Sequence, residues 1–569
     1  MRGSRYSSRQ PPSMLDFVPE SDEAEISYVR PAVGSSYHPN SRTGRRASHM
    51  DIVLVNPQSD TMPPNSTAPP SLRPTDNNSR RPSLPASGQS RGSLAKINSM
   101  LIEAPITQVV NILKDIIEEL KSENGDRLAL SGRLESALSI IQCSELYTPH
   151  FQSFSQSSAL ANNRAAQDLV EGLMRPSQPS HRRSSAGENI LSTSRPPALS
   201  DRYNINAGVP AVVSRCLEGS QAWDWNILQL ETVSEFTPLR FLGMKVFREF
   251  DVPRQLQIDE ITLERWLVLI EQNYLATNPY HNSTHAADVL SATAYFLRTE
   301  RCKNLLSEFD MVASLIAAII HDVDHPGRTN AFLCNSRHEL ALLYNDTAVL
   351  ENHHVAKTFK LTLDPMNDAN IFNRLNHEDY QTIRSNIIDM VLATELGKHF
   401  EHVNKFISST RSNVDEPDRS PRTSQISISA SENDDQELRT LAKRVLIKVS
   451  DVSNPARPRK QCIEWTRRVC EEYFTQTQEE TERNLPIVMP TFKREVCSIP
   501  KTQTAFINYF LLDMFDAWHE FCDVPRVLNH LKNNLQFWDE MDRLELTTIE
   551  QIHEHAHLDT TEEGGTIDE

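Results

Sequence analysis

The sequence predicts an all-α catalytic domain with a buried site between its helices. From about residue 224 to residue 546, Trp, Phe, Leu and Ile recur at the three- and four-residue spacing of a helix face, and turn residues become sparse. Strand signals over the same range are weak. Helices of this kind bury their apolar faces against one another, and sites in such domains form between facing helices.

Several segments of this range carry the helical pattern. They are residues 262–274, 286–297, 311–320, 339–344, 380–392, 438–448, 461–474 and 502–521. A low-complexity segment, about 408–436, interrupts the pattern with Ser, Asn, Asp and Arg. Its composition predicts a disordered insertion that forms a solvated surface loop rather than a domain boundary.

The residues outside the catalytic range divide into four parts. Residues 1–95 are rich in Ser, Pro, Arg and Asn and predict a disordered tail, because they hold too little apolar surface to offset chain entropy. An apolar stripe in residues 96–150 predicts a helical hairpin. This hairpin either packs on the catalytic domain, docks a partner or forms a homodimer. Residues 151–223 read as a flexible linker and 547–569 as an acidic C-terminal tail.

The composition narrows the class of partner and the compartment. A net charge of −18 argues against nucleic acid as the main partner, since binding to a phosphate backbone needs clustered Lys and Arg. It leaves a small phosphate ester open as substrate, because bound metal ions can supply positive charge. The eight cysteines form no CxxC pair and favour buried thiols in a reducing compartment. With no apolar run near the about 18 residues of a membrane helix, we expect a cytoplasmic protein without a transmembrane segment.

Three short motifs carry the metal chemistry. In the first, HNSTH, His281 and His285 stand four apart, so on a helix both imidazoles project from one face. Such a pair can act as a ligand and a proton carrier, although a solvated or core pair is commoner. In the second, HDVDHPG, His321 and Asp322 follow the apolar run 314–320 directly. Two metal-ligand side chains then lie at the tip of a buried helix, which the Pro-Gly pair ends.

The third motif, DVSNP, places Asp451 after the apolar-periodic segment 438–449. A single Asp before Asn-Pro is ordinarily a helix cap, so Asp451 indicates a metal site only together with the histidines and Asp322 of the other two motifs. Two His and two Asp make a four-ligand set that suits Zn²⁺ with water completing the shell. One shared carboxylate plus waters suits a neighbouring Mg²⁺ or Mn²⁺. Two ions about 3.5–4 Å apart are the usual arrangement for in-line attack on phosphorus.

The runs HNSTHAAD, HDVDHPGRTN, LYNDTAVLENHH, DVSNP and KTQTAFINYFLLDMFDAW resemble the class I cyclic nucleotide phosphodiesterases. Over about residues 102–541 the chain is most similar to phosphodiesterase family 8, the high-affinity, cAMP-specific class that is insensitive to the common xanthine inhibitor. The resemblance implies a compact HD-type phosphodiesterase domain. It also implies hydrolysis of cAMP to 5′-AMP by a two-metal mechanism, which terminates cAMP signalling.

The resemblance implies a role for each matching residue of the metal site. His281 would be the general acid that protonates the departing O3′ of the ribose. Asp322 would contact both the zinc and the magnesium, whose other ligands are mainly waters. The implied zinc ligands are His285, His321, Asp322 and Asp451. The residues implied to hydrogen-bond metal-bound water or the phosphate are His325, Glu351, Thr394 and Glu395.

The resemblance also implies a purine pocket. Gln503 would hydrogen-bond the purine edge, while Phe506 stacks on one face of the base and Val469 closes the other. Asn454 would add a contact that favours adenine. The full set of implied substrate-binding residues is Tyr280, Asn454, Val469, Tyr473, Gln503 and Phe506.

Some positions depart from the wider class. Lys448 stands where many classes carry His, and Tyr473 where many carry Phe; family 8 shares both. Ser450 stands where Ala is usual. Nothing before the hairpin resembles a receiver or PAS module, so control through a PAS ligand is expected to be absent. A dual cAMP/cGMP phosphodiesterase, another HD-type metal phosphohydrolase and a non-catalytic scaffold are the alternatives.

Arg-Arg-x-Ser sequences outside the catalytic range suggest a kinase as modifier. They end at Ser48, Ser83 and Ser185, and Pro82 makes the second a poorer site. Paired arginines before a serine suit a basophilic kinase such as the cAMP-dependent kinase. Ser185 lies between the hairpin and the catalytic domain, where a phosphate is expected to change how these parts dock.

Overall fold

The computed structural model describes residues 163–174, 208–412 and 427–562, with single residues between 109 and 141. Residues 163–174, 208–412 and 427–562 belong to one compact unit. Across these described ranges every regular element is helical and no strand occurs, which confirms the all-α prediction. The predicted disordered tail, 1–95, lies outside the described residues. So does most of the predicted hairpin, 96–150, although its described residues, such as Val109, are helical.

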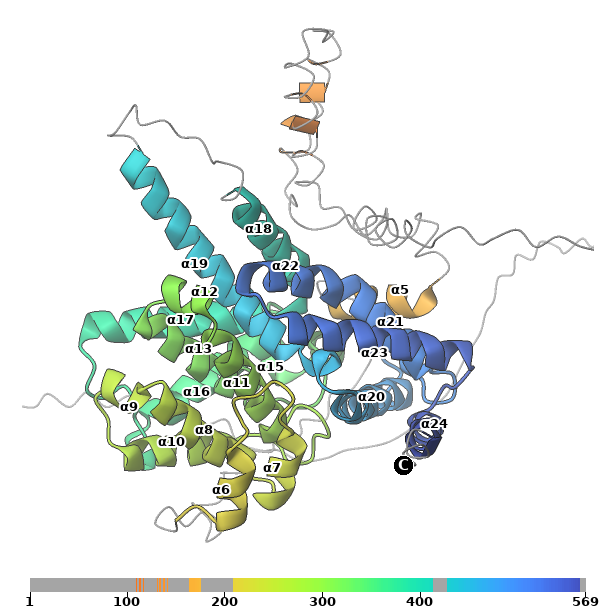
Figure 1. The fold of residues 1–569 in the computed structure, drawn as a ribbon, viewed down its shortest axis with the longest axis horizontal. Helices are drawn as coiled ribbons and strands as arrows, with labels where there is room; N and C mark the ends of the chain where they lie inside the picture. The colour runs from red at the N-terminus through yellow and green to blue at the C-terminus, as the bar shows by residue number, and fades with distance from the viewer. Residues whose placement is uncertain are drawn as a thin grey trace, which may run out of the picture. The chain divides into compact units, whose positions relative to one another are not determined.

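Two helices at the centre of the catalytic domain hold its core. Both α11 (Ser283–Leu297) and α13 (Glu308–Ile320) bury nearly every residue, and they pack on each other. Around them, α13 contacts α17 (His377–Ala393), while α11 contacts α8 (Pro238–Glu249) and α19 (Ser427–Asp451) (Figure 1). A helix that is apolar on all sides belongs in such an interior position. The ends of α11, α13 and α19 therefore meet inside the protein.

The remaining helices complete the domain around this core. Before α19 in the chain lie α6 (Ala211–Leu217), α7 (Ile227–Val233), α9 (Val252–Gln255), α10 (Glu260–Glu271), α12 (Glu300–Leu305), α14 (Asn330–Ser336), α15 (Glu339–Leu343), α16 (Val349–Leu363) and α18 (His399–Ser412). The 3₁₀ turns are η1 (Pro365–Asn367), η2 (Leu396–Lys398), η3 (Asn454–Ala456) and η4 (Pro490–Phe492). After α19 come α20 (Arg459–Glu482), α21 (Ile499–Phe506), the π-helical turn η5 (Ile507–Leu511), α22 (Leu512–Cys522), α23 (Pro525–Arg543) and α24 (Ile549–Glu562).

Local sequence sets where the central helices begin. The Asn282 side chain accepts hydrogen bonds from the backbone N–H groups of Thr284 and His285 and so caps α11. Ser307 and Asp310 form a reciprocal capping box at the start of α13. These caps satisfy amide groups that would otherwise lack partners at a helix end.

All the segments predicted as helices are helical, and most of their boundaries differ from the predicted ones by a few residues. The segment 502–521 differs in character, because it comprises α21, the π turn η5 and α22 rather than one α-helix. A π turn widens the helix locally and is frequent at functional sites.

The linker and tail predictions are wrong in part. A helix, α5 (Arg164–Met174), lies within the predicted linker 151–223, which also contains α6. The sequence of α5 has a short apolar stripe, in which Leu169 and Val170 are buried. Because the flanking sequence is rich in Ser and Arg, the composition of the whole segment predicted a linker. Likewise α24 occupies much of the predicted tail 547–569, with Ile549 and Ile552 buried.

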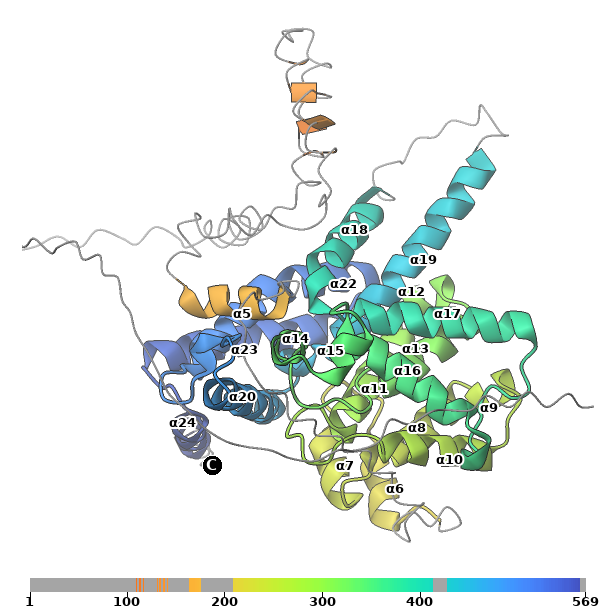
Figure 2. The same cartoon turned by 180° about the vertical axis from the view of Figure 1, so that it is seen from behind.

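The predicted loop at 408–436 is shorter than expected. Helix α18 continues to Ser412, and α19 already begins at Ser427, so the two ends of the predicted loop are helical. Figure 2 shows α18 and α19 side by side, in agreement with their contacts. Once the core part of a helix is formed, adding further residues costs little, which explains the extension into polar sequence.

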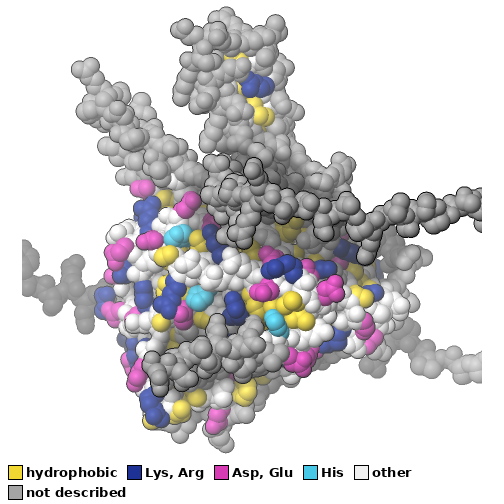
Figure 3. Space-filling model, turned by 45° about the vertical axis from the view of Figure 1, so that its right-hand side comes forward, with side chains coloured by type: hydrophobic (Ala, Val, Ile, Leu, Met, Phe, Trp, Pro, Cys, Tyr) yellow, Lys and Arg dark blue, Asp and Glu magenta, His cyan; other side chains and the backbone are white. Residues whose placement is uncertain are grey.

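The surface and the cysteines agree with the composition. Acidic and basic side chains intermingle on the face drawn in Figure 3, where the described residues show no broad patch of positive charge. No described cysteine forms a disulfide, and most are buried. Among the helices of the described ranges, none is long and apolar enough to cross a membrane.

Candidate metal centre and substrate pocket

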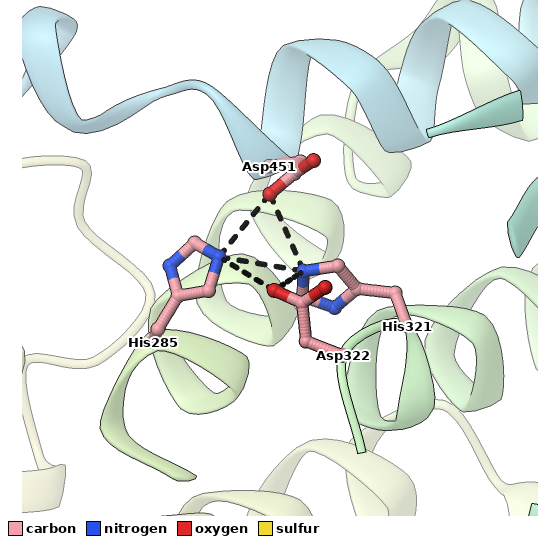
Figure 4. A group of neighbouring side chains, drawn as sticks. All are labelled: His285, His321, Asp322 and Asp451. Carbon is pink, nitrogen blue, oxygen red and sulfur yellow. Dashed lines mark hydrogen bonds and ion pairs between the residues drawn. The ribbon is translucent and has the colours of Figure 1, made fainter. Parts of the chain in front are cut away.

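Four side chains from the ends of α11, α13 and α19 converge on one point (Figure 4). His285 lies in the first turn of α11, His321 and Asp322 directly follow α13, and Asp451 is the last residue of α19. The Nε2 atoms of the two histidines are 3.3 Å apart. The Oδ1 atom of Asp451 lies 3.1 Å from Nε2 of His285, and Oδ2 of Asp322 lies 3.1 Å from Nε2 of His321. The structure thus brings together all four residues that the resemblance implies as zinc ligands.

The donor atoms of this cluster fit a divalent cation. The Nδ1–H of His321 donates to the Ala318 carbonyl at 3.0 Å, so in the neutral ring Nε2 carries the lone pair that points into the cluster. One ligand atom from each of the four residues lies within 4.8 Å of the others. Two imidazole nitrogens and two carboxylates form a donor set that suits a divalent cation. A cation between them would also offset the repulsion between the carboxylates Asp322 and Asp451.

A buried asparagine ties the two histidine loops together. The Nδ2 group of Asn278 donates to the backbone carbonyls of His281, at 2.9 Å, and His325, at 2.7 Å. Its Oδ1 atom would lie 2.8 Å from a Cβ at position 327, where the backbone φ is +69°. Gly327 is therefore required by both the close approach and the left-handed backbone. Asn278 is a site residue that the sequence reasoning missed, because a lone Asn carries no signal.

His281 lies beside the cluster and is held by a glutamate of α20. Its Nδ1 atom is 2.5 Å from Oε2 of Glu472, whose Oε1 accepts the backbone N–H groups of Tyr280 and His281 at 2.8 Å each. The ring stacks on that of His325 with centroids 3.9 Å apart. Burial disfavours the charged ring, but the Glu472 carboxylate outweighs this effect and the pKa of His281 rises to about 9. The contact with Glu472 therefore favours the protonated form of the His281 ring at neutral pH.

Sequence reasoning also missed Glu472. It stands three residues after Val469 on the same helix, so the spacing could have placed it on the face that lines the site. Its importance rests on the contact with His281, which is 191 residues away in the chain.

A cavity of about 400 Å³ adjoins the cluster. His281, Asp322 and Asp451 line it, and so do the four residues expected to hold water or phosphate: His325, Glu351, Thr394 and Glu395. Burial and the nearby Glu395 raise the pKa of Glu351 to about 7. Lys448 donates to the backbone carbonyl of Glu395, a residue of the cavity lining, at 3.0 Å.

A second cavity, of about 130 Å³, lies next to the first and shares His281 and Asp451 with it. Its lining includes all six residues expected to bind the nucleoside: Tyr280, Asn454, Val469, Tyr473, Gln503 and Phe506. Thr466 donates to Oε1 of Gln503 at 3.2 Å. Aromatic and aliphatic walls with amide groups between them suit a flat heterocycle that needs polar contacts at its edge.

The amide of Asn454 has a fixed orientation. Its Nδ2 group donates to Oδ2 of Asp288 at 2.9 Å, and its Oδ1 accepts from the hydroxyl of Tyr280. Asp288 is buried and paired with Arg457 at 2.7 Å, so its carboxylate can only accept. If the amide were flipped, Oδ1 of Asn454 would face Oδ2 of Asp288 without a hydrogen bond, so only one orientation of the amide is favourable. Asp288 is a further residue that the sequence reasoning did not include in the site.

The predicted phosphorylation sites Ser48 and Ser185 lie outside the described residues.

The chain is similar to known phosphodiesterases. Residues 280–534 match the family model of 3′5′-cyclic nucleotide phosphodiesterases. The mouse high affinity cAMP-specific and IBMX-insensitive 3′,5′-cyclic phosphodiesterase 8A is 47% identical over 480 residues, which are 83% of this chain and 56% of the relative. The Drosophila melanogaster phosphodiesterase 8 of the same description is 43% identical over 474 residues, 83% of this chain and 49% of the relative.

A solved structure is similar as well. The phosphodiesterase domain of the RhoPDE fusion protein from the choanoflagellate Salpingoeca rosetta matches with a TM-score of 0.50 and 29% identity, and the match covers 59% of this chain and 100% of that domain. The present chain spans about half the length of the curated relatives it matches.

Proposed function

Since the chain belongs to the class I cyclic nucleotide phosphodiesterases, with family 8 relatives, we propose that its catalytic domain hydrolyses cAMP to 5′-AMP and so terminates cAMP signalling. The observation that carries this proposal is the convergence at one site of a His/Asp cluster that can hold a cation, the pair of His281 and Glu472, and a pocket with a fixed amide. The test is hydrolysis of cAMP and cGMP side by side by the purified protein, with and without Mg²⁺. Hydrolysis of cAMP alone is expected, and no hydrolysis of either nucleotide in the presence of metal would contradict the proposal.

We assign the tighter metal site to His285, His321, Asp322 and Asp451, with Zn²⁺ as its ion. A second ion, Mg²⁺ or Mn²⁺, would share Asp322 and take waters as its other ligands. Bound divalent cations supply positive charge that polarises the phosphate and lowers the pKa of water. Metal analysis of the purified protein, before and after dialysis against a chelator, tests this assignment without an activity assay.

The chain's own residues would bind the nucleotide and move its protons. His281 would donate its proton to the departing O3′ of the ribose while Glu472 holds the ring in place. At the phosphate end, the roles of binding water and phosphate fall to His325, Glu351, Thr394 and Glu395. At the base end, Gln503 would bond the purine edge, and the pocket walls would come from Tyr280, Val469, Tyr473 and Phe506.

The pH dependence should reveal the contact between Glu472 and His281. Because the pKa of His281 is raised to about 9, its acid form persists at neutral pH and is lost as the pH rises through about 9. The Glu472→Gln variant removes the charge that raises this pKa, so the alkaline fall of kcat/KM should move to lower pH. Profiles of kcat/KM against pH measure the shift. Glu471→Gln is the matched control, because Glu471 pairs with Arg494 at the surface. If kcat/KM falls at the same alkaline pH in the wild type, Glu472→Gln and Glu471→Gln, the proposed role of Glu472 is wrong.

Selectivity for adenine should depend on the fixed amide of Asn454. Its Oδ1 atom can accept from the 6-amino group of adenine, whereas the 6-oxygen of guanine would face it without a hydrogen bond. An unpaired polar group costs about 1–3 kcal/mol, so the kcat/KM ratio of cAMP to cGMP should fall about 5- to 150-fold in Asn454→Ala. Efficient cGMP hydrolysis by the wild-type protein at low substrate concentration would contradict this reading and favour the dual-specificity alternative.

The sequence alone supports regulation by phosphorylation. We expect the cAMP-dependent kinase to modify Ser48 and Ser185, and the phosphate at Ser185 to raise turnover, which closes a negative feedback loop on cAMP. Phosphosite mapping after kinase treatment, with turnover compared between wild type and Ser185→Ala, measures both effects. Equal turnover with and without phosphate at Ser185 would end this proposal.

Two more proposals rest on the sequence: a cytoplasmic location, and a homodimer through the apolar stripe of residues 96–150. Light scattering of the full chain, compared with a chain that lacks residues 96–150, tests the dimer.

A further inference from the structure

Two buried cysteines from distant parts of the chain face each other. Cys302 lies in α12 and Cys522 is the last residue of α22, and their Sγ atoms are 3.6 Å apart. The two residues stand 220 positions apart in the chain, and α12 contacts α22 (Figure 1). The sulfurs of a disulfide are about 2.05 Å apart, so an approach of about 1.5 Å would join them. The fold therefore holds the two thiols nearly within bonding distance.

The cysteine pair lies just beneath the surface. Cys302 is 1% exposed and Cys522 is 6% exposed, whereas the neighbouring residues Arg301, Lys303 and Asp523 are exposed. Helix α12 has only six residues, and a helix this short has little stability of its own and opens locally. A small neutral oxidant such as hydrogen peroxide can therefore reach the sulfurs while the domain stays folded.

The surroundings of the pair favour a thiolate at Cys302. The hydrogen bond from Cys522 and the nearby guanidinium of Arg301 lower the pKa of the Cys302 thiol. By contrast, burial raises the pKa of the Cys462 thiol to about 12. The thiolate is the form that reacts with oxidants, so Cys302 should react before a buried thiol such as Cys462.

We propose that Cys302 and Cys522 form a reversible disulfide when a peroxide reaches the protein, and that this bond ties α12 to α22. The Cys302 thiolate attacks one oxygen of hydrogen peroxide, the O–O bond breaks, and the other oxygen leaves as hydroxide and takes up the thiol proton to form water. The Cys522 sulfur then displaces the hydroxyl of the Cys302 sulfenic acid, which leaves as a second water with the Cys522 proton. Two thiols and one hydrogen peroxide thus give one disulfide and two waters, and the two sulfurs supply the two electrons that reduce the peroxide.

The bond is expected to stabilise the domain and to leave the substrate site unchanged. It would join residues 220 positions apart, and a cross-link over a long loop restricts the unfolded chain. Neither cysteine is among the described residues that line the two cavities of the substrate site. The inference therefore does not depend on which nucleotide the pocket binds.

Peroxide treatment of the purified, reduced full chain tests the bond directly. Peptide mapping without reductant should show a cross-link between Cys302 and Cys522, and a dithiol reductant should remove it. The thermal unfolding midpoint should rise by about 5–10 °C on oxidation. Cys302→Ala and Cys522→Ala should each show neither the cross-link nor the rise. Cys216→Ala removes a partly exposed thiol of α6 and is the matched control, which should behave as wild type.

Peptide mapping of the wild-type protein needs no variant, so it decides the question even where a substitution impairs folding. The proposal is wrong if both thiols survive the treatment, if either cysteine is linked to another partner, or if Cys302 is oxidised further beside an intact Cys522 thiol. A cross-link between the two without a rise of the midpoint would also contradict it. A loss of cAMP hydrolysis on oxidation that Cys302→Ala prevents would show that the bond closes the site, against the expected stabilisation of an unchanged site.

Discussion

Replacement of Asp451 by Asn should reduce cAMP hydrolysis by about 10²–10³-fold, the loss expected when one preorganised electrostatic partner of a reaction is removed. The Oδ1 atom of Asp451 lies 3.1 Å from Nε2 of His285 and 3.3 Å from Nε2 of His321. Asparagine keeps the size and shape of the side chain but lacks its charge, so bound zinc should fall while the fold is retained. The measurements are kcat, zinc content per protein and the thermal unfolding midpoint.

A surface carboxylate provides the matched control for this variant. Asp516 pairs with Lys532 at 2.9 Å and is about half exposed, so Asp516→Asn changes the same charge without touching the cluster. Its zinc content and kcat should equal those of wild type. An Asp451→Asn protein that binds zinc normally and keeps most of its activity would show that Asp451 is no metal ligand.

The metal cluster could be predicted from the sequence because its parts are local patterns. His321 and Asp322 directly follow an apolar run. Because such a run is buried in the core, the residues at its end are expected to lie inside the protein. His285 and Asp451 could be predicted as metal ligands only in combination with His321 and Asp322, and the family resemblance provided that combination. The structure adds that α11, α13 and α19 bring their ends to one place, a fact of tertiary packing that no single segment carries.

The supporting residues could not be predicted in the same way. Glu472 acts on His281 across 191 residues, and Asp288 fixes Asn454 across 166 residues. Such hydrogen bonds depend on which helices meet, and an isolated Glu or Asp in a helix reads as a solvated surface residue. Helix α5 was missed for another reason, since its apolar stripe is short and its flanks have the composition of a linker.

Replacement of His281 by Ala should lower kcat by about 10²–10⁴-fold, the usual contribution of general acid–base catalysis, and should leave the metal content intact. His281 lies beside the four-residue cluster and directs its Nδ1 atom to Glu472 instead of the cluster. The loss arises because the O3′ alkoxide departs without a proton. A phosphodiester with a p-nitrophenolate leaving group needs no such proton, so its hydrolysis should suffer far less than that of cAMP.

The comparison of these two substrates separates proton donation from a general disturbance of the site. His530→Ala is the control, because His530 pairs with Asp224 at 2.9 Å away from the pocket and should leave both rates unchanged. If His281→Ala slows both substrates equally, His281 acts by positioning the phosphate and not by protonating the leaving group. If the variant loses its zinc, His281 is itself a ligand and the roles assigned to His281 and His285 are exchanged. Intact zinc with a selective loss of cAMP hydrolysis is the result that the hydrogen bond to Glu472 predicts, since that bond keeps the ring protonated at the pH of the reaction.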